Sequence, residues 1–218
     1  MTTIKKLTLF LLLNAVVFSV FAQEKTKVKI STEFGDMIVE LHNDTPFHRD
    51  NFIKNAQNGW YDGTIFHRVI PQFMAQGGDP NSINATADQT LGIDRCQKIP
   101  AEILPHYFHK KGALAAARLP DNMNPERFSS GCQFFIVQGF RHSPDQLANQ
   151  GKVIPPKQQA WYKAVGGSAF LDGDYTIFGQ VIEGLEVLDL ISAMPTHKDG
   201  GIKDRPVEDV PMTVKIIQ

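Results

Sequence analysis

The chain has 218 residues, of which 42% are hydrophobic and 21% are charged, and its formal net charge is -1. This is an ordinary globular composition that can bury one sizeable core. Because no basic stripe is present to attract phosphate backbones, we expect no nucleic-acid partner. Two cysteines, Cys96 and Cys132, are too few for a disulfide framework or a four-cysteine zinc site. They could form one bridge in an oxidising compartment or remain two separate thiols.

Residues 1–22 have the pattern of a secretory signal peptide. The basic pair Lys5 and Lys6 precedes an apolar run, and a small residue stands before Gln23. The run is shorter than the ~20 residues needed to span a bilayer, which favours a cleaved signal over a membrane anchor. We therefore expect a mature domain of residues 23–218 that is exported, to the periplasm, without stable membrane insertion.

The folded part begins with a predicted hairpin. Apolar and polar residues alternate over 28–32 and again over 37–41, on either side of a turn at Phe34-Gly35-Asp36. Thr45-Pro46 predicts a helix N-cap followed by proline at the first helical position, and Gly59 predicts the helix end. The residues expected to face the core from this helix are Phe47, Phe52 and Ile53.

The stretch from Phe66 to Asp79 begins with the alternation of a half-buried strand. A proline then breaks the ladder, because proline has no N–H to donate, and a Gly-Gly-Asp turn ends the run. One arginine, two soft apolar side chains and one amide come from this single bent segment: Arg68, Phe73, Met74 and Gln76. These groups could line an apolar pocket with a cation at its rim, although a core strand with a solvated arginine would show the same pattern.

A long surface loop is expected over residues 80–111, where the hydrophobic pattern weakens. His106 and His109 are three residues apart, but no third ligand can be placed beside them, so we interpret both as solvated loop histidines and expect no metal. Residues 141–167 are polar and contain Pro155-Pro156, which predicts an inserted surface excursion with one short helix.

The remaining pattern consists of short strands and one further helix. Strands are predicted over 112–117, 133–138, 175–181 and 210–216, and an amphipathic helix over 185–191 ends before Pro195. Several strands, two helices and no alternating strand–helix rhythm favour a barrel of the all-β or α+β class.

Three stretches resemble signatures of the cyclophilin family of peptidyl-prolyl isomerases. Every fixed position of Phe-His-Arg-Val-Ile-x-x-Phe-Met-x-Gln-Gly-Gly-Asp is matched over 66–79. The second signature resembles residues 112–117 and 129–136, and the third resembles residues 170–179. This resemblance runs over nearly the whole mature chain. It implies a mainly β fold, a closed antiparallel eight-stranded β-barrel capped by two α-helices.

The resemblance also implies an enzyme that rotates X-Pro bonds to assist the folding of exported proteins. Amide resonance sets a barrier of ~18–20 kcal/mol, and no bond is made or broken, so the catalyst need only bind the twisted amide best. No cofactor is needed. Arg68 is the implied catalytic residue, because a guanidinium stays charged and can donate to the prolyl nitrogen. The implied substrate-binding residues are Phe73, Met74, Gln76, Ala117, Arg118, Phe135, Phe170, Leu171 and Tyr175. The expected partners of this monomer are proline-containing polypeptides.

Three positions depart from the family pattern. Arg118 stands where the family has Asn, Phe170 where it has Trp, and Tyr175 where it has His. We expect activity to survive, local charge preference to change, and cyclosporin binding to be weak because the indole N–H is lost. These departures and the insertions 80–111 and 141–167 also leave open a non-catalytic proline-binding or chaperone module on the same fold.

Three other residues are given structural interpretations. His67 alternates with Arg68 and is expected to pack in the barrel. Cys132 replaces a family serine, and we expect a small buried residue, since no base is evident that would activate a nucleophile. Asp172 is expected to support the turn at Gly173.

Overall fold

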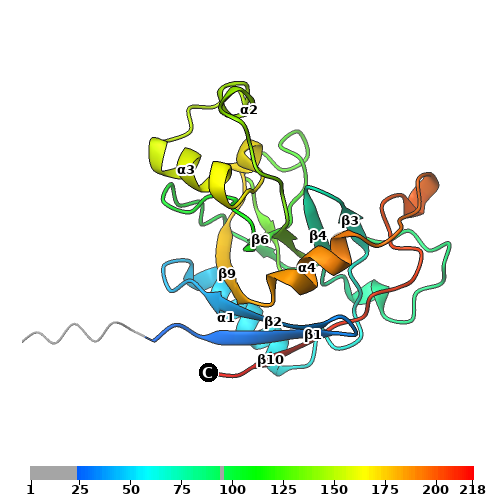
Figure 1. Ribbon diagram of the computed structural model, residues 1–218. Coiled ribbons are helices and arrows are strands. Elements are labelled where there is room, and N and C mark those ends of the chain that lie inside the picture. The colour runs from blue at the N-terminus through cyan, green and yellow to red at the C-terminus, as the bar shows by residue number, and fades with distance from the viewer. Residues whose placement is uncertain (1–23, 94–95) are drawn as a thin grey trace, which may run out of the picture.

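The computed structural model describes residues 24–93 and 96–218, so the predicted signal peptide lies outside the described residues. Its strands are β1 (Lys27–Thr32), β2 (Gly35–Leu41), β3 (Arg68–Ile70), β4 (Met74–Gly77), β5 (Lys98–Ile99), β6 (Ala113–Ala116), β7 (Ser129–Ser130), β8 (Phe134–Val137), β9 (Ile177–Glu183) and β10 (Thr213–Ile216). Its α-helices are α1 (Pro46–Gln57), α2 (Pro144–Ala148), α3 (Pro156–Ala164) and α4 (Leu185–Ser192) (Figure 1). Three short 3-10 helices are η1 (Pro80–Ser82), η2 (Ala169–Leu171) and η3 (Gly200–Ile202). No helix within these ranges is long and apolar enough to cross a membrane.

Eight of the strands form one sheet in the order β10-β1-β2-β9-β6-β8-β4-β3, and each described pair of neighbours is antiparallel. The edge strands β10 and β3 are connected by the segments that precede them. The Phe66 N–H donates to the Val210 carbonyl at 3.0 Å, and the Met212 N–H donates to the Thr64 carbonyl at 2.8 Å. The predicted antiparallel barrel is therefore confirmed, although a few such bonds, rather than a full ladder, complete it.

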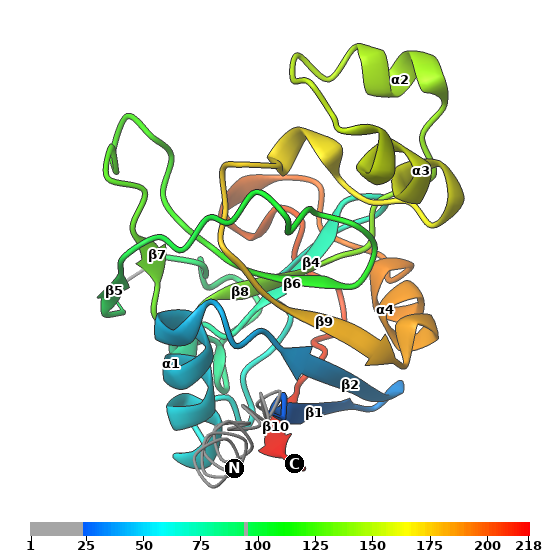
Figure 2. The ribbon, with the colours of Figure 1, turned by 90° about the vertical axis from the view of Figure 1, so that its left-hand side faces the viewer.

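The core lies inside this curved sheet and beneath two helices. Alternate residues of β1 and β2, including Val28, Ile30 and Val39, are fully buried, as the period-two pattern predicted. Figure 2 shows α1 and α4 on opposite sides of strands β2 and β9, so the two predicted capping helices are present. Phe52 of α1 and Leu188 of α4 are buried against the core.

The start of α1 differs from the prediction in its cap. Thr45 occupies the N-cap position, but its side chain makes no capping hydrogen bond. Glu102 accepts instead from the backbone N–H groups of Phe47 at 3.1 Å and His48 at 3.0 Å. Phe47 is 61% exposed, so its predicted place in the core is wrong: it lies on the outer side of the first helical turn. A carboxylate from a distant loop thus satisfies the free N–H groups that begin every helix.

The insertion at 141–167 contains two helices, where one had been expected. Helix α2 begins with a reciprocal capping box between Ser143 and Gln146. Leu147, Ile154 and Tyr162 form a small hydrophobic core under α2 and α3. This unit, called the insertion lobe below, rises from the barrel in Figure 1.

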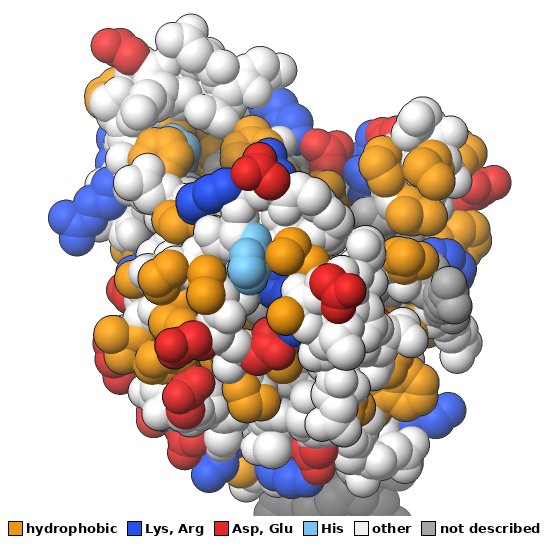
Figure 3. Space-filling model, turned by 90° about the vertical axis from the view of Figure 1, so that its right-hand side faces the viewer, with side chains coloured by type: hydrophobic (Ala, Val, Ile, Leu, Met, Phe, Trp, Pro, Cys, Tyr) orange, Lys and Arg blue, Asp and Glu red, His pale blue; other side chains and the backbone are white. Residues whose placement is uncertain are grey.

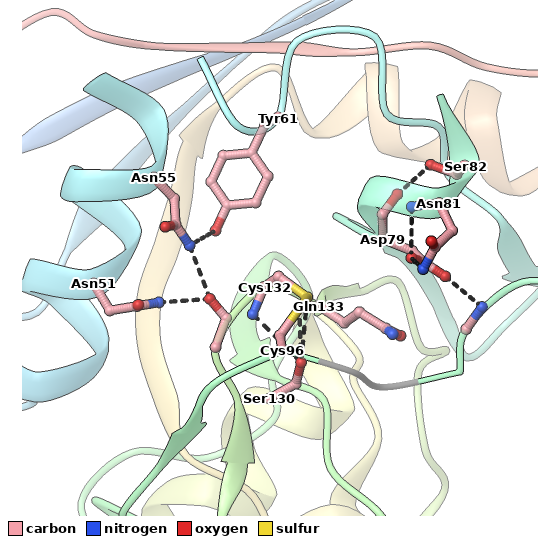
Figure 4. The surroundings of a disulfide bond; sticks show 12 residues. Asn51, Asn55, Tyr61, Asp79, Asn81, Ser82, Cys96, Ser130, Cys132 and Gln133 are labelled. Carbon is pink, nitrogen blue, oxygen red and sulfur yellow. Dashed lines mark hydrogen bonds between the residues drawn. A yellow bond between two sulfur atoms is a disulfide. The ribbon is translucent and has the colours of Figure 1, made fainter. Parts of the chain in front are cut away.

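The loop 80–111 is attached to the barrel by a disulfide between Cys96 and Cys132, whose Cα atoms lie 5.9 Å apart. Figure 4 shows the bond beside α1, where Asn51 and Asn55 both donate to the Gly131 carbonyl at 2.8 Å. Of the two states considered for the cysteines, the structure has the bridge. Cys132 is buried, as predicted, and as a disulfide it cannot act as a nucleophile.

Removing this bond by a Cys96→Ser, Cys132→Ser double substitution should lower the free energy of unfolding. The bond closes a loop with a sequence separation of 36 residues. For a loop of this size chain entropy predicts a loss of about 4 kcal/mol. Urea unfolding of both proteins, each without reductant, measures the difference. If the double variant matches the wild type, and the unfolded wild type has two titratable thiols, the bridge does not form.

Candidate active site

The β3–β4 hairpin places its two polar side chains next to each other on the outer face of the sheet. Arg68 pairs directly with Gln76 across the strands, and its Nη1 donates to Gln76 Oε1 at 3.4 Å. On its other side, Arg68 Nε lies 3.7 Å from the Asp204 carboxylate. The Arg68 side chain remains 44% exposed, so its guanidinium is oriented but accessible.

A cavity of about 90 Å³ lies beside this guanidinium. Its apolar floor includes Met74 of β4, Phe135 of β8 and Leu171 of η2, all buried. The complete lining is Arg68, Phe73, Met74, Gln76, Ala117, Arg118, Phe135, Leu171 and Tyr175. The structure thus gathers in one pocket all but one of the residues implied as catalytic or substrate-binding. The exception is Phe170, which is outside the lining but whose ring packs, tilted by 38°, with its centre 5.3 Å from that of the Phe73 ring.

Arg118 is held against the pocket wall. Its Nε donates to the Asp174 carbonyl at 2.7 Å, and its guanidinium lies 4.7 Å from the centre of the Tyr175 ring. Its Nη1 donates to Asp121 at 2.5 Å, and this bond helps hold the pKa of the Asp121 carboxyl below its usual value. The Arg118 side chain is only 6% exposed. Its positive charge is therefore paired, which limits its effect on an approaching substrate.

Gln133 is a site residue to which the sequence analysis gave no role. The Gln76 Nε2 donates to Gln133 Oε1 at 3.0 Å, which leaves Gln76 Oε1 to face Arg68. Gln133 is 3% exposed, and its own Nε2 has no hydrogen-bond partner among the described residues. The sequence signal that could have identified Gln133 is an amide at the start of the apolar run 134–137. A polar side chain that is buried there needs a hydrogen-bond partner.

The wall formed by residues 169–175 is attached to the loop before β6 and to the insertion lobe. Asp172 Oδ1 accepts from the His109 backbone N–H at 2.8 Å and lies 3.0 Å from His109 Nδ1. Asp172 Oδ2 accepts from the Tyr162 hydroxyl at 2.7 Å. Lys152 Nζ donates to the carbonyls of Phe170 at 2.8 Å and Asp172 at 2.7 Å. Asp172 therefore does more than support a turn: it is the centre of this attachment.

His109 is fully buried in these contacts, so the prediction that it is a solvated loop histidine is wrong. Burial lowers the pKa of His109, which favours its neutral form beside Asp172. His106 is exposed, as predicted, and lies 2.9 Å from Asp44. The two histidines do not form a metal pair, and the described ranges contain no cluster of three or more ligands that could hold a metal.

His67 is buried beneath the site, which confirms its predicted place in the packing. Both of its ring nitrogens lack a hydrogen-bond partner in the described structure. Burial is the main reason that the pKa of His67 falls to about 4. The ring is therefore neutral at pH 7 and adds no second charge next to Arg68.

One face of the molecule has mixed charge. On the face shown in Figure 3, acidic and basic side chains are interspersed, and the surface is hollowed between two raised lobes. Near the pocket, too, basic side chains lie beside acidic ones, since Arg118 and Arg127 both contact Asp121.

The family pattern described as cyclophilin type peptidyl-prolyl cis-trans isomerase/CLD matches residues 27–216. The chain belongs to this family. A putative peptidyl-prolyl cis-trans isomerase of Staphylococcus haemolyticus is 37% identical over 84% of this cyclophilin and 87% of its own length. A Staphylococcus aureus protein of the same description is 36% identical over 86% and 89% of the two chains.

A longer relative and a solved structure are also similar to this chain. A putative bifunctional phosphatase/peptidyl-prolyl cis-trans isomerase of Streptococcus pyogenes is 37% identical over 84% of this chain, which spans only 37% of that protein. A cyclophilin-type isomerase of Cryptosporidium parvum has a similar crystal structure, with a TM-score of 0.65, 25% identity, and coverage of 89% of this cyclophilin and 99% of the solved chain. A second crystal structure of that isomerase was determined in the presence of the dipeptide Ala-Pro.

The buried His67 should make stability fall in acid. An unfolded chain binds a proton on histidine near pH 6.5, whereas folded His67 does so only near its pKa of about 4. The contribution of neutral, buried His67 to the free energy of unfolding is therefore complete above pH 6.5. This contribution is lost as the pH falls from 6.5 to about 4.

In His67→Gln, the loss between pH 7 and pH 4 should be smaller by about 3 kcal/mol. Urea unfolding at several pH values measures it. Val153→Ser, which changes a fully exposed residue that does not titrate, is the control and should keep the wild-type slope. The pKa of His42 also falls to about 4 through burial, so His42 still contributes to the loss of stability in acid in both variants. An unchanged slope in His67→Gln would contradict the assignment.

Proposed function

We propose that Arg68 and the pocket beside it carry the peptidyl-prolyl cis-trans isomerase activity of this cyclophilin. The observation that supports this most strongly is the position of one accessible guanidinium at the rim of an apolar cavity of about 90 Å³. Such a cavity suits a prolyl ring, which has no N–H and presents only apolar carbon. The substrates are proline-containing polypeptides, and one chain supplies the whole lining, so we propose that the monomer is active.

The proposed mechanism is electrostatic and needs no proton transfer. Rotation about the X-Pro bond removes amide conjugation and leaves a lone pair on the prolyl nitrogen. Arg68 donates to that nitrogen in the twisted state and has little to offer the planar amide, so it lowers the barrier selectively. Gln76 and Asp204 orient the guanidinium beforehand, which reduces the reorganisation needed during rotation.

The remaining side chains hold the substrate on both sides of the rotating bond. We assign Phe73, Met74, Phe135 and Leu171 to the proline ring, with Phe170 at their edge. Gln76 is assigned to the substrate backbone, and Ala117 with the backbone of Arg118 to the residue before proline. Tyr175 closes the pocket with its ring at 5.5 Å and 87° to Phe135.

We further propose that the protein is exported and assists the folding of other exported proteins in the periplasm. Residues 1–22 would be its cleaved signal peptide. The Cys96–Cys132 bond supports this location, because disulfides persist mainly in oxidising compartments. Cell fractionation, with sequencing of the mature N-terminus for a start at Gln23, tests this part separately.

The alternative is a non-catalytic module that binds proline peptides in the same pocket. The observation that favours it is the fixed Arg118–Tyr175 pair, which stiffens one wall. The two functions differ in one measurement, since a binding module would hold an X-Pro peptide without accelerating its isomerisation.

Replacement of Arg68 by Ala should lower kcat/KM for a short X-Pro peptide by roughly 10²–10³, the loss typical of one removed electrostatic donor. The assay follows cis-to-trans conversion by the protein that starts at Gln23. Arg49→Ala, which removes an arginine from α1, is the charge-matched control and should keep the wild-type rate. Retained activity in Arg68→Ala would refute the role of Arg68. Binding without acceleration by the wild type would favour the alternative.

A Phe170→Trp substitution should tighten the weak binding that we propose for cyclosporin-class inhibitors. An indole restores one N–H donor while the aromatic surface beside Phe73 is kept. One net hydrogen bond is worth about 1 kcal/mol, which corresponds to a roughly fivefold lower Kd. Isothermal titration calorimetry of both proteins measures this change. Equal Kd values would show that the missing indole does not limit affinity.

A further inference from the structure

A second cavity, of about 180 Å³, shares no lining residue with the pocket beside Arg68. It is called the side cavity below. The residue after β2, the strand β9 and the chain before β6 supply its walls, which include His42, Ile177, Tyr107, Phe108 and Lys110. None of the described lining residues is acidic. The side cavity is therefore mainly aromatic and contains one lysine.

The aromatic wall of the side cavity is held in place by its own contacts. The rings of His42 and Tyr107 are parallel, with centres 4.0 Å apart and planes 3° apart. The Tyr107 hydroxyl donates to Asp44 Oδ1 at 2.5 Å, and Asp44 Oδ2 lies 2.9 Å from His106 Nε2. The Asp44 carboxylate is therefore engaged outside the lining, and a ligand does not have to order this wall in order to bind.

Lys110 brings a positive charge to the side cavity without an acidic partner. Its ammonium lies 5.9 Å from the centre of the Phe108 ring and 4.7 Å from that of the Trp161 ring. No carboxylate of the described residues forms an ion pair with it, and burial, with the nearby Lys25 charge, lowers the pKa of Lys110. An anion in the side cavity would give this partly desolvated ammonium a charged hydrogen-bond acceptor.

His42 brings a buried imidazole to the same walls. The residue is 7% exposed, and its Nδ1 has no hydrogen-bond partner in the described structure. Burial is the main reason that the pKa of His42 falls to about 4, and the charges of Lys25 and Lys110 add to this shift. The ring is therefore neutral at pH 7 and has one N–H to donate. An acceptor on a ligand would offset the cost of leaving a buried polar group unpaired.

We propose that the side cavity binds a monocarboxylate that carries one apolar ring. Lys110 and His42 donate to the carboxylate, and the aromatic wall covers the ring together with Ile177. The charge favours a monoanion, because a single ammonium would leave the second charge of a phosphate unpaired. The size also fits, since a cavity of about 150 Å³ can hold a benzene ring. A free acid and the last residue of a polypeptide share this chemistry.

The test is an NMR titration of the isotope-labelled protein with phenylacetate, and with phenylacetamide as an uncharged probe of the same shape. The amide should bind roughly tenfold more weakly than the acid. Lys110→Met should raise the Kd of the acid by a similar factor, the loss typical of a charge-assisted hydrogen bond. His42→Phe keeps an aromatic ring beside Tyr107 but removes the N–H, and should raise the Kd about fivefold. The control is Lys54→Met, which removes an exposed charge of α1 outside the lining and should leave the Kd unchanged.

Three results would overturn the site: no saturable shifts with phenylacetate, equal Kd values for the acid and its amide, or an unchanged Kd in Lys110→Met. Loss of binding in Arg68→Ala would also overturn it, because the acid would then occupy the pocket beside Arg68. None of these results bears on isomerisation, since the two cavities share no lining residue.

A dipeptide that ends in phenylalanine distinguishes the two sources of the ligand. If it binds at least as tightly as phenylacetate, and Lys110→Met weakens it equally, the site takes the end of a polypeptide. If it binds more weakly than phenylacetate, the site takes a free acid.

Discussion

The hydrogen-bonded register of β4 between β3 and β8 is the constraint on which the site depends. Gln76 pairs with Arg68 on one side and with Phe135 on the other, and Phe135 in turn pairs with Ala115 of β6. Paired residues in neighbouring strands lie on the same face, so this row crosses the outer face of the barrel. A slip of one residue in β4 would turn Gln76 inward and Ala75 outward, and the pocket would lose its polar rim.

One wall of the pocket lies outside the sheet and depends on side-chain contacts. Residues 169–175 form η2 and a turn, with no ladder to hold Leu171 and Tyr175 in place. The Asp172 carboxylate and the Lys152 ammonium supply the missing support from the interior and from the insertion lobe. The insertion is therefore part of the structural basis of the pocket, and its removal would loosen the wall that we propose faces the proline ring.

Local patterns were sufficient to predict most strands, α1, α4 and the outward position of Arg68, whereas β4, β5 and β7 were not predicted as strands. Alternation with period two and the apolar stripe of residues 185–191 are properties of neighbouring residues, so they can be found without a structure. The family resemblance then placed Ala117, Phe135 and Leu171 with Arg68, and the pocket lining agrees with that grouping. The second helix of the insertion was missed, because α2 is only five residues long and presents too few turns for a periodic signal.

Most of the other features that could not be predicted join residues distant in sequence. Glu102 caps α1 across 54 and 55 residues, and Asp172 binds His109 across 63. Phe47 and His109 have side chains whose burial depends on which loop covers them, and hydrophobicity alone does not settle that.

The sequence by itself determined most of the barrel strands, the outward position of Arg68 and the membership of the chain in its family, because these follow from short periodic patterns and contiguous motifs. Only the tertiary structure decided that Cys96 and Cys132 are bonded, that Gln133 orients Gln76, and that the insertion lobe supports the wall of the pocket beside Arg68. The physical reason is that such contacts depend on distances set by the closed fold, and a residue's near neighbours in the chain do not contain that information.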